Sequence, residues 1–92
     1  MDKRILKQRG GQYIRKLRKK AGKTQLELSK ALGYDYYSFI SQVEQGTSKI
    51  PSEALGQWAA ALNVDLREFA TRLLEYYEPE FYQAIFGKRK LK

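Results

Sequence analysis

Apolar residues recur along this chain at intervals of three and four, which is the spacing of one face of an α-helix. In its first half these stripes predict helices over about residues 12–20, 24–32 and 36–45. Ile14 and Leu17 face inward from the first helix, and Ile40 and Val43 from the third. No segment shows the strict alternation of a half-buried strand, so the pattern predicts an all-α protein.

Three further helices are predicted after residue 50. The first carries Leu55, Trp58, Ala59 and Leu62 on its apolar face. The second has an inner face made of Leu66, Phe69, Ala70, Leu73, Leu74 and Tyr77. A last short helix follows Pro79 and carries Phe81, Tyr82, Ile85 and Phe86. Proline ends one helix and suits the first turn of the next, so residues 78–79 mark a boundary.

Polar residues with capping chemistry mark the helix ends. Thr24 and Glu27 have the spacing of a capping box, in which each side chain bonds the other residue's backbone N–H. Asp65 and Glu68 predict a second box. Either Asp35 or Tyr36 is expected to cap the helix over residues 36–45. Glycine commonly follows the last turn of a helix, as it does here at Gly22, Gly33, Gly46 and Gly87.

Positive charge is concentrated at the two ends of the chain. Residues 1–23 contain ten basic residues and one acidic residue, whereas residues 51–87 contain two basic and six acidic ones. Residues 88–92 add four basic residues, and the formal net charge is +8. Such a polarised distribution is typical of proteins that bind polyanions. A solvated surface that only keeps the protein in solution is the alternative interpretation.

Several kinds of chemistry are excluded or disfavoured by composition. The sequence has no cysteine and no histidine, so it offers no disulfide, no thiolate or imidazole metal ligand and no histidine base. No glycine-rich phosphate loop is present, and Glu75, Glu78 and Glu80 have the spacing of a solvated helix face. We predict that the protein is not an enzyme and uses no metal or cofactor.

The location is predicted from what the sequence lacks. No run of about 18 apolar residues is available to span a bilayer. The basic residues 1–7 are not followed by the apolar stretch of a secretory signal. We expect a cytoplasmic protein without a membrane partner, and we find no evident small-molecule site.

Two segments carry a family resemblance. The first is IRKLRKKAGKTQLELS (residues 14–29), and the second is ISQVEQG (residues 40–46). Together with the apolar stripe over residues 51–66, they make the chain from residue 12 to residue 66 resemble the Xre family, the phage-repressor and Cro type of helix-turn-helix regulator. The resemblance implies a five-helix lambda-repressor-like DNA-binding domain, here with an additional short C-terminal helix.

The chain departs from the family pattern in two places. Ser29 stands where the family usually has alanine, a change between small residues that we expect to be harmless. The stretch between Gly33 and Glu44 holds one more residue than the commonest spacing, which leaves the start of the recognition helix open by one position. The predicted organisation is a basic arm (1–11), a helix-turn-helix domain (12–77) and an aromatic helix with a basic tail (78–92).

The outward positions of the recognition helix are candidates for reading DNA bases. They are Tyr37, Ser38, Ser41 and Gln42. The major groove admits one α-helix, and a glutamine there can bond the N6 and N7 edge of adenine in a bidentate manner. Serine can donate or accept, and a tyrosine ring can pack on a thymine methyl. The alternative is that these residues form only the solvated face of an amphipathic helix.

Candidates for phosphate contacts surround that helix. Gln25 lies in the first turn of the preceding helix, where free backbone N–H groups favour an anion. The family's layout adds Lys23, Gln45, Thr47, Ser48 and Lys49, although both lysines could equally be ordinary surface charges. In repressors of this type, residues matching Arg18 and Glu44 form a partly buried ion pair that orients the recognition helix, so the resemblance implies the same pair here.

The C-terminal aromatic residues leave two interpretations open. Phe81, Tyr82, Ile85 and Phe86 exceed what one small core needs and are candidates for a homodimer contact, although they could also complete the core. Residues 1–9 and 88–92 either add non-specific DNA contacts or only solubilise the chain.

The predicted partner is a double-stranded DNA operator, read as a palindrome by two copies about 34 Å apart. The resemblance implies a transcriptional repressor, often autoregulatory and often encoded on a phage or other mobile element. An antitoxin-type regulator is a variant of this prediction. A protein-interaction or RNA-binding module on the same scaffold is the alternative, which Tyr34, Tyr36 and Tyr37 keep open.

Overall fold

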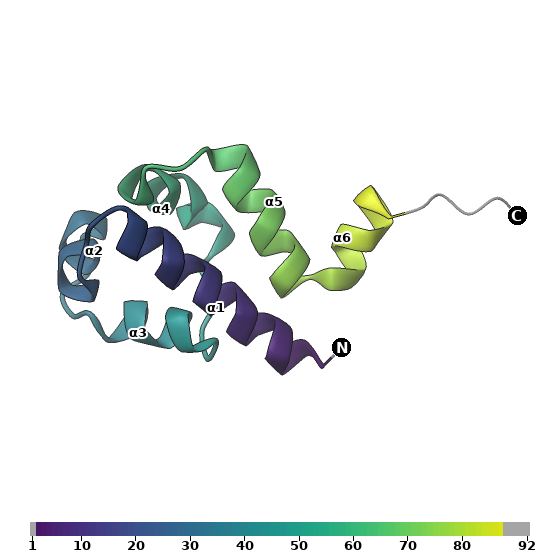
Figure 1. Ribbon diagram of the computed structural model, residues 1–92, viewed down its shortest axis with the longest axis horizontal. Helices are drawn as coiled ribbons and strands as arrows, with labels where there is room; N and C mark the ends of the chain where they lie inside the picture. The colour runs from purple at the N-terminus through teal and green to yellow at the C-terminus, as the bar shows by residue number, and fades with distance from the viewer. Residues whose placement is uncertain (1, 88–92) are drawn as a thin grey trace, which may run out of the picture.

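The computed structural model describes residues 2–87, which form six α-helices and one short 3₁₀ turn. The elements are α1 (Lys3–Lys20), α2 (Gln25–Leu32), α3 (Ser38–Gln45), the 3₁₀ turn η1 (Ser52–Ala54), α4 (Leu55–Leu62), α5 (Leu66–Tyr77) and α6 (Pro79–Phe86). The described range contains no strand, which confirms the all-α prediction. In Figure 1, α2 and α3 lie at one end of the molecule and α6 lies at the other.

A single apolar core joins the first five helices. Its members are Ile14, Leu28, Ile40, Val43, Ile50, Trp58, Ala59, Leu62, Phe69 and Leu73. Each of α1 to α5 contributes at least one of them, whereas α6 contributes none. The inward positions predicted for the helices that correspond to α1, α3 and α4 are therefore confirmed, apart from Leu17 and Leu55, which are partly buried.

The capping predictions hold in part. At the start of α2 the Thr24 hydroxyl accepts from the Glu27 backbone N–H (3.0 Å), and the Glu27 carboxylate accepts from the Thr24 N–H (2.9 Å). The Thr24 backbone bond lowers the pKa of the Glu27 carboxyl below its ordinary value of 4.5. At α5 only one of the two bonds forms, from the Glu68 N–H to the Asp65 carboxylate.

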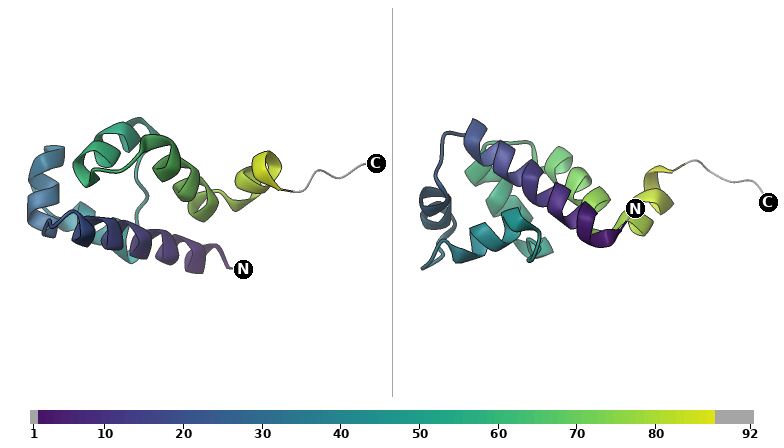
Figure 2. Two further views of the ribbon diagram at one scale, coloured as in Figure 1. Left: turned by 45° about the horizontal axis from the view of Figure 1, so that its top comes forward. Right: turned by 60° about the horizontal axis from the view of Figure 1, so that its bottom comes forward.

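The first helix is longer than the sequence predicted. α1 begins at Lys3, so the predicted start near residue 12 and the separate arm over residues 1–11 are wrong. The carboxylate of Asp2 caps the helix by accepting from the Arg4 N–H (2.8 Å). Residues 3–11 are continuous with the rest of α1, as Figure 2 shows, and they pack beside α3 and α5.

Two glycines explain both the error and the packing. Glycine in a helix interior costs about 1 kcal/mol relative to alanine, so Gly10 and Gly11 predict an end to the helix rather than its middle. In the structure, a Cβ atom at residue 11 would overlap with the backbone carbonyl of Glu44 in α3. A Cβ atom at residue 10 would lie 3.0 Å from Cβ of Tyr76 in α5. The two glycines therefore let α3 and α5 approach the α1 backbone.

The last helix projects from the domain. None of its residues is buried, and Phe81, Ile85 and Phe86 are 61%, 55% and 54% exposed. The prediction of a short helix here is confirmed, but its apolar residues do not complete the core. Leu66 is also exposed, at 49%, so its assignment to the inner face of α5 is wrong.

Candidate nucleic-acid interface

The connection between α2 and α3 is held by a buried serine. Gly33 ends α2 with a φ of 79°, which is the left-handed conformation that glycine adopts most easily. The Ser29 hydroxyl, which is buried, donates to the Tyr36 carbonyl at 2.9 Å. A backbone bond from the Tyr34 N–H to the Ser29 carbonyl (3.0 Å) closes the same turn. This turn lies in the stretch between Gly33 and Glu44, for which an additional residue is predicted.

The third helix begins two residues later than the predicted start at about residue 36. Tyr37, rather than Asp35 or Tyr36, precedes its first turn, and no side chain caps it. Tyr37 is 54% exposed, Ser38 and Gln42 are exposed, and Ser41 is partly exposed. Ile40, Val43 and Glu44 face the protein. The four predicted base-reading residues therefore share the outward side of α3 and its first turn.

The end of α3 is tied to the loop that follows. Ser48 donates through its hydroxyl to Oε1 of Gln42 (3.1 Å), and Thr47 donates to the Gln42 carbonyl (3.2 Å). The Gln42 side-chain NH₂ group has no partner in the described residues, and Oε1 keeps a second lone pair. Gln42 therefore presents a donor and an acceptor side by side on an exposed surface, which is the pairing that an adenine edge requires.

A buried ion pair fixes α3 against α1. Nε of Arg18 lies 2.6 Å from Oε2 of Glu44, and a second guanidinium nitrogen lies 3.1 Å from Oε1. The two side chains are only 9% and 4% exposed, so the implied ion pair is present and is bidentate. Arg18 also donates to the Lys23 carbonyl at 2.8 Å, which orders the turn before α2.

Gln25 connects α2 to this pair. Its amide nitrogen donates to Oε1 of Glu44 at 3.1 Å. A polar groove of about 570 Å³ lies above the ion pair and is lined by Gln8, Gln12, Arg15, Arg18, Gln25, Ser41, Glu44 and Gln45. The structure thus places two predicted phosphate-contacting residues, Gln25 and Gln45, beside the predicted base-reading Ser41. Gln45 donates to the Ser41 hydroxyl at 3.2 Å, one turn apart on α3.

Two of the predicted phosphate-contacting residues point elsewhere. The Lys23 amine donates to the Ala61 carbonyl of α4 at 2.7 Å. The Lys49 amine lies 3.1 Å from Oε2 of Glu78 and 5.7 Å from the centre of the Tyr77 ring. Their roles stay predictions, and in this structure neither amine joins the groove between α1, α2 and α3. Thr47 and Ser48 are next to Gln42, as described above.

Three groove residues were not predicted to belong to the site. Gln8, Gln12 and Arg15 come from α1 and line the same groove as Gln25 and Gln45. Their spacing of four and then three would have placed them on one side of a helix. The signal was missed because the helix was expected to begin near residue 12.

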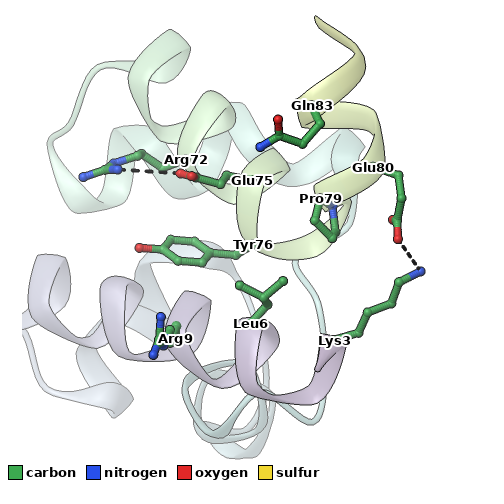
Figure 3. A pocket seen from close by; sticks show the side chains of 9 residues that line it. All are labelled: Lys3, Leu6, Arg9, Arg72, Glu75, Tyr76, Pro79, Glu80 and Gln83. Carbon is green, nitrogen blue, oxygen red and sulfur yellow. Dashed lines mark ion pairs between the residues drawn. The ribbon is translucent and has the colours of Figure 1, made fainter. Parts of the chain in front are cut away.

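A second groove lies at the opposite end of α1. It measures about 880 Å³ and is lined by Lys3, Leu6, Arg9, Arg72, Glu75, Tyr76, Pro79, Glu80 and Gln83. Figure 3 shows these side chains, with Lys3 reaching from α1 towards Glu80 of α6. Their ion pair of 3.3 Å, and that of Arg72 with Glu75 (3.7 Å), leave the groove with mixed charge. The exposed Lys3–Glu80 pair connects the start of α1 to α6.

Comparison with known proteins decides the family. The family model described as Helix-turn-helix matches residues 14–69, which is more than half of the chain. The chain belongs to the helix-turn-helix family. The resemblance to the Xre and Cro type and the lambda-repressor-like fold, both expected from the sequence, are confirmed. A search of curated proteins found no match.

Membership assigns the chain a DNA-binding domain of regulatory proteins, which is not a catalytic family. Within this helix-turn-helix domain, α2 and α3 are the helix pair, and α3 carries the exposed polar side chains. The match ends at residue 69 and begins at residue 14, so α6 and the first half of α1 lie outside it. None of the helices in residues 2–87 is long and apolar enough to cross a membrane.

Proposed function

We propose that this protein is a sequence-specific transcriptional repressor that inserts α3 into the major groove of an operator. The observation that carries the proposal is the outward side of α3, where Tyr37, Ser38, Ser41 and Gln42 offer hydrogen-bonding groups without a charge. Hydrogen-bonding groups on a helix in the major groove can read base edges, whereas contacts to phosphates position the protein without reading sequence. The Arg18–Glu44 pair behind α3 supports this role because it fixes the helix direction.

The surroundings of α3 suit the phosphates on either side of the groove. Gln25 at the start of α2, and Gln45, Thr47 and Ser48 at the end of α3, lie close to the base-reading residues. Under this proposal Lys23 and Lys49 contact phosphates only after they leave the Ala61 carbonyl and the Glu78 carboxylate. A location in the cytoplasm follows from the proposed access to DNA.

We further propose that the protein acts as a homodimer through α6. Phe81, Ile85 and Phe86 are more than half exposed, on a helix of eight residues without a buried side chain. An isolated helix of this length is marginal in water, so a contact with the same helix of a second copy would stabilise it. Such an interface is self-complementary, and two copies related by a two-fold axis would read a palindromic operator.

The decisive experiment selects duplexes from a randomised pool with the wild-type chain. We expect enrichment of an inverted repeat, and we expect Gln42→Ala to cost about 1–3 kcal/mol at one or two positions of each half-site. Gln57→Ala is the matched control, because Gln57 is an exposed glutamine on α4, away from the groove. The proposal is wrong if no sequence is enriched, or if RNA and random duplex are bound as tightly as the selected site.

The repressor role needs its own readout. Transcription in vitro from a promoter that overlaps the selected site should fall as the protein is added, because a bound domain blocks RNA polymerase. Stimulated transcription would indicate an activator instead.

The proposed dimer is tested by sedimentation of the double variant Phe81→Lys/Ile85→Lys, in which self-association should be weakened by at least about 100-fold. Gln83→Lys adds the same kind of charge on another side of α6 and should leave the mass unchanged.

A further inference from the structure

α1 carries a concentration of positive charge that the domain core does not need. Its eighteen residues include Lys3, Arg4, Lys7, Arg9, Arg15, Lys16, Arg18, Lys19 and Lys20, and no acidic residue. Arg18 is neutralised by the buried Glu44, Lys3 is paired with Glu80 of α6, and Arg4 is paired with Asp2. The middle and the last turn of the helix keep an excess of cations at the surface.

Polar and basic residues follow one side of α1 over most of its length. Arg4, Gln8, Arg15 and Lys19 are separated by four, seven and four residues, which places them on one side of an α-helix, with Gln12 between them. All five are exposed. Gln8, Gln12 and Arg15 line the groove that Gln25, Ser41 and Gln45 close from the other wall. This row, which we term the α1 stripe, therefore lies beside α3.

The close packing of α1 on α3 fixes the position of the α1 stripe relative to α3. Gly11 lets the Glu44 backbone touch the α1 backbone, and a Cβ at Gly46 would lie 2.8 Å from Cα of Gln8. Gly46 ends α3 with a φ of 81°. Because backbone meets backbone at both points, the α1 stripe is held at a fixed position beside the last turn of α3.

The chemistry of the groove suits a phosphodiester. The Glu44 carboxylate at its base is bonded by Arg18 and Gln25, so its charge is compensated. The guanidinium of Arg15 and the amide groups of Gln8 and Gln12 are then the groups available to a ligand. A guanidinium and amide N–H groups donate to phosphate oxygens, and these contacts add affinity without reading sequence.

We infer that α1 forms a second row of contacts to the DNA backbone. Gln8, Gln12 and Arg15 contact phosphates beside the one that Gln25 contacts, and Arg4, after it leaves Asp2, contacts a phosphate further along the same strand. The inference rests on the proposed function, since it takes α3 to lie in the major groove. The α1 segment up to residue 13 lies outside the matched family region. Arg15 lies within that region, whereas Arg4, Gln8 and Gln12 lie outside it and lengthen the footprint beyond what the region provides.

The test measures how the affinity for the selected operator depends on salt. Each phosphate contact changes the slope of log K against log salt by about 0.9, which is about 3.5-fold between 50 and 200 mM. Arg15→Gln should reduce the slope by about that amount. Lys16→Gln, the adjacent exposed residue on a different side of α1, is the matched control and should change the slope by less than half as much.

A gain of contact gives an independent test. Gln8→Lys should add about 0.9 to the slope and tighten binding several-fold at 50 mM salt, whereas Gln57→Lys on α4 should not. Phosphate ethylation should interfere at positions outside the α3 contacts, and this interference should disappear in Arg15→Gln.

The two α1 variants, Arg15→Gln and Gln8→Lys, decide the inference. If both behave as their controls while Gln42→Ala still loses specificity, the inference is wrong and the proposed function stands. If the randomised pool yields no enriched sequence, the proposed function fails, and with it the inference.

Discussion

The Glu44 carboxylate joins three helices through side-chain bonds. Oε2 accepts from Arg18 of α1, and Oε1 accepts from Arg18 and from Gln25 of α2. Both oxygens are satisfied although the side chain is only 4% exposed. A buried ion pair contributes little net stability because its desolvation offsets the attraction. Its main contribution here is to fix the direction of α3, on which Glu44 lies.

Ser29 is more than a neutral replacement for alanine. Its hydroxyl donates to the Tyr36 carbonyl, within the turn between α2 and α3. An alanine at this position would leave that carbonyl without its donor. The expectation of a harmless difference considered only the size of the side chain, whereas the structure shows a buried hydrogen bond.

We predict that Ser29→Ala lowers the free energy of unfolding by about 0.5–1.5 kcal/mol, because a buried hydrogen bond of this type is lost. The measurement is urea unfolding followed by circular dichroism. Ser52→Ala is the control, since the Ser52 side chain is exposed and has no hydrogen bond within residues 2–87, and it should change stability by less than about 0.5 kcal/mol. Equal effects of the two substitutions would argue against the role of Ser29.

At the scale of elements, apolar periodicity and capping residues were sufficient to predict every helix. They act locally, and the stripe of α4 or the capping box of α2 can be recognised within a few residues. The helix boundaries that were predicted wrongly depend on contacts between residues that are distant in sequence. Gly10 and Gly11 favour a helix end locally, and only the close approach of α3 and α5 explains why α1 continues through them.

Part of the candidate site could also be predicted from the sequence. Ser38, Ser41 and Gln42 follow from the inward positions of Ile40 and Val43 by helical spacing alone. The directions of Lys23 and Lys49 could not be predicted, because long flexible side chains find partners far along the sequence. Lys23 bonds a carbonyl of residue 61, and Lys49 bonds Glu78.

A pair of glycine substitutions tests the packing of α1. Gly11→Ala should lower the free energy of unfolding by about 1–3 kcal/mol or more, because its Cβ would overlap with the Glu44 backbone. Gly56→Ala is the matched control in α4, where nothing lies within 4 Å of the added Cβ. That substitution should raise stability by about 0.5–1 kcal/mol through helix propensity. Thermal or urea unfolding would measure both, and a stabilising Gly11→Ala would contradict the packing described here.

At the scale of the whole molecule, the titratable groups predict a free energy of unfolding that changes little over a wide range of pH. Burial raises the pKa of Tyr77 above 10.0, so the folded state favours its neutral form and loses stability as the pH rises beyond that value. The pKa of Glu27 is lowered below 4.5 by the Thr24 backbone bond, so its contribution is present above that pH and is lost as the pH falls. No histidine or cysteine titrates between these limits.

We therefore expect the free energy of unfolding to be nearly constant from about pH 6 to about pH 9, with losses on both sides. Denaturant unfolding at a series of pH values would measure it. Tyr77→Phe should reduce the alkaline loss, and the part that remains should reflect Tyr13, whose pKa is also raised by burial. A transition centred near pH 6.5 would contradict this expectation.

The adjacent glycines of α1 have a consequence for operator spacing. Since α3 and α5 both rest directly on the α1 backbone, the helix proposed to read DNA is held rigidly to α5, the helix that leads into α6. In the proposed dimer, this packing then restricts the angle between the two α3 helices. Inserting one base pair between half-sites turns one of them by about 35° around the duplex axis. A molecule built in this way tolerates such an insertion poorly, whereas a regulator with a flexible linker accepts it.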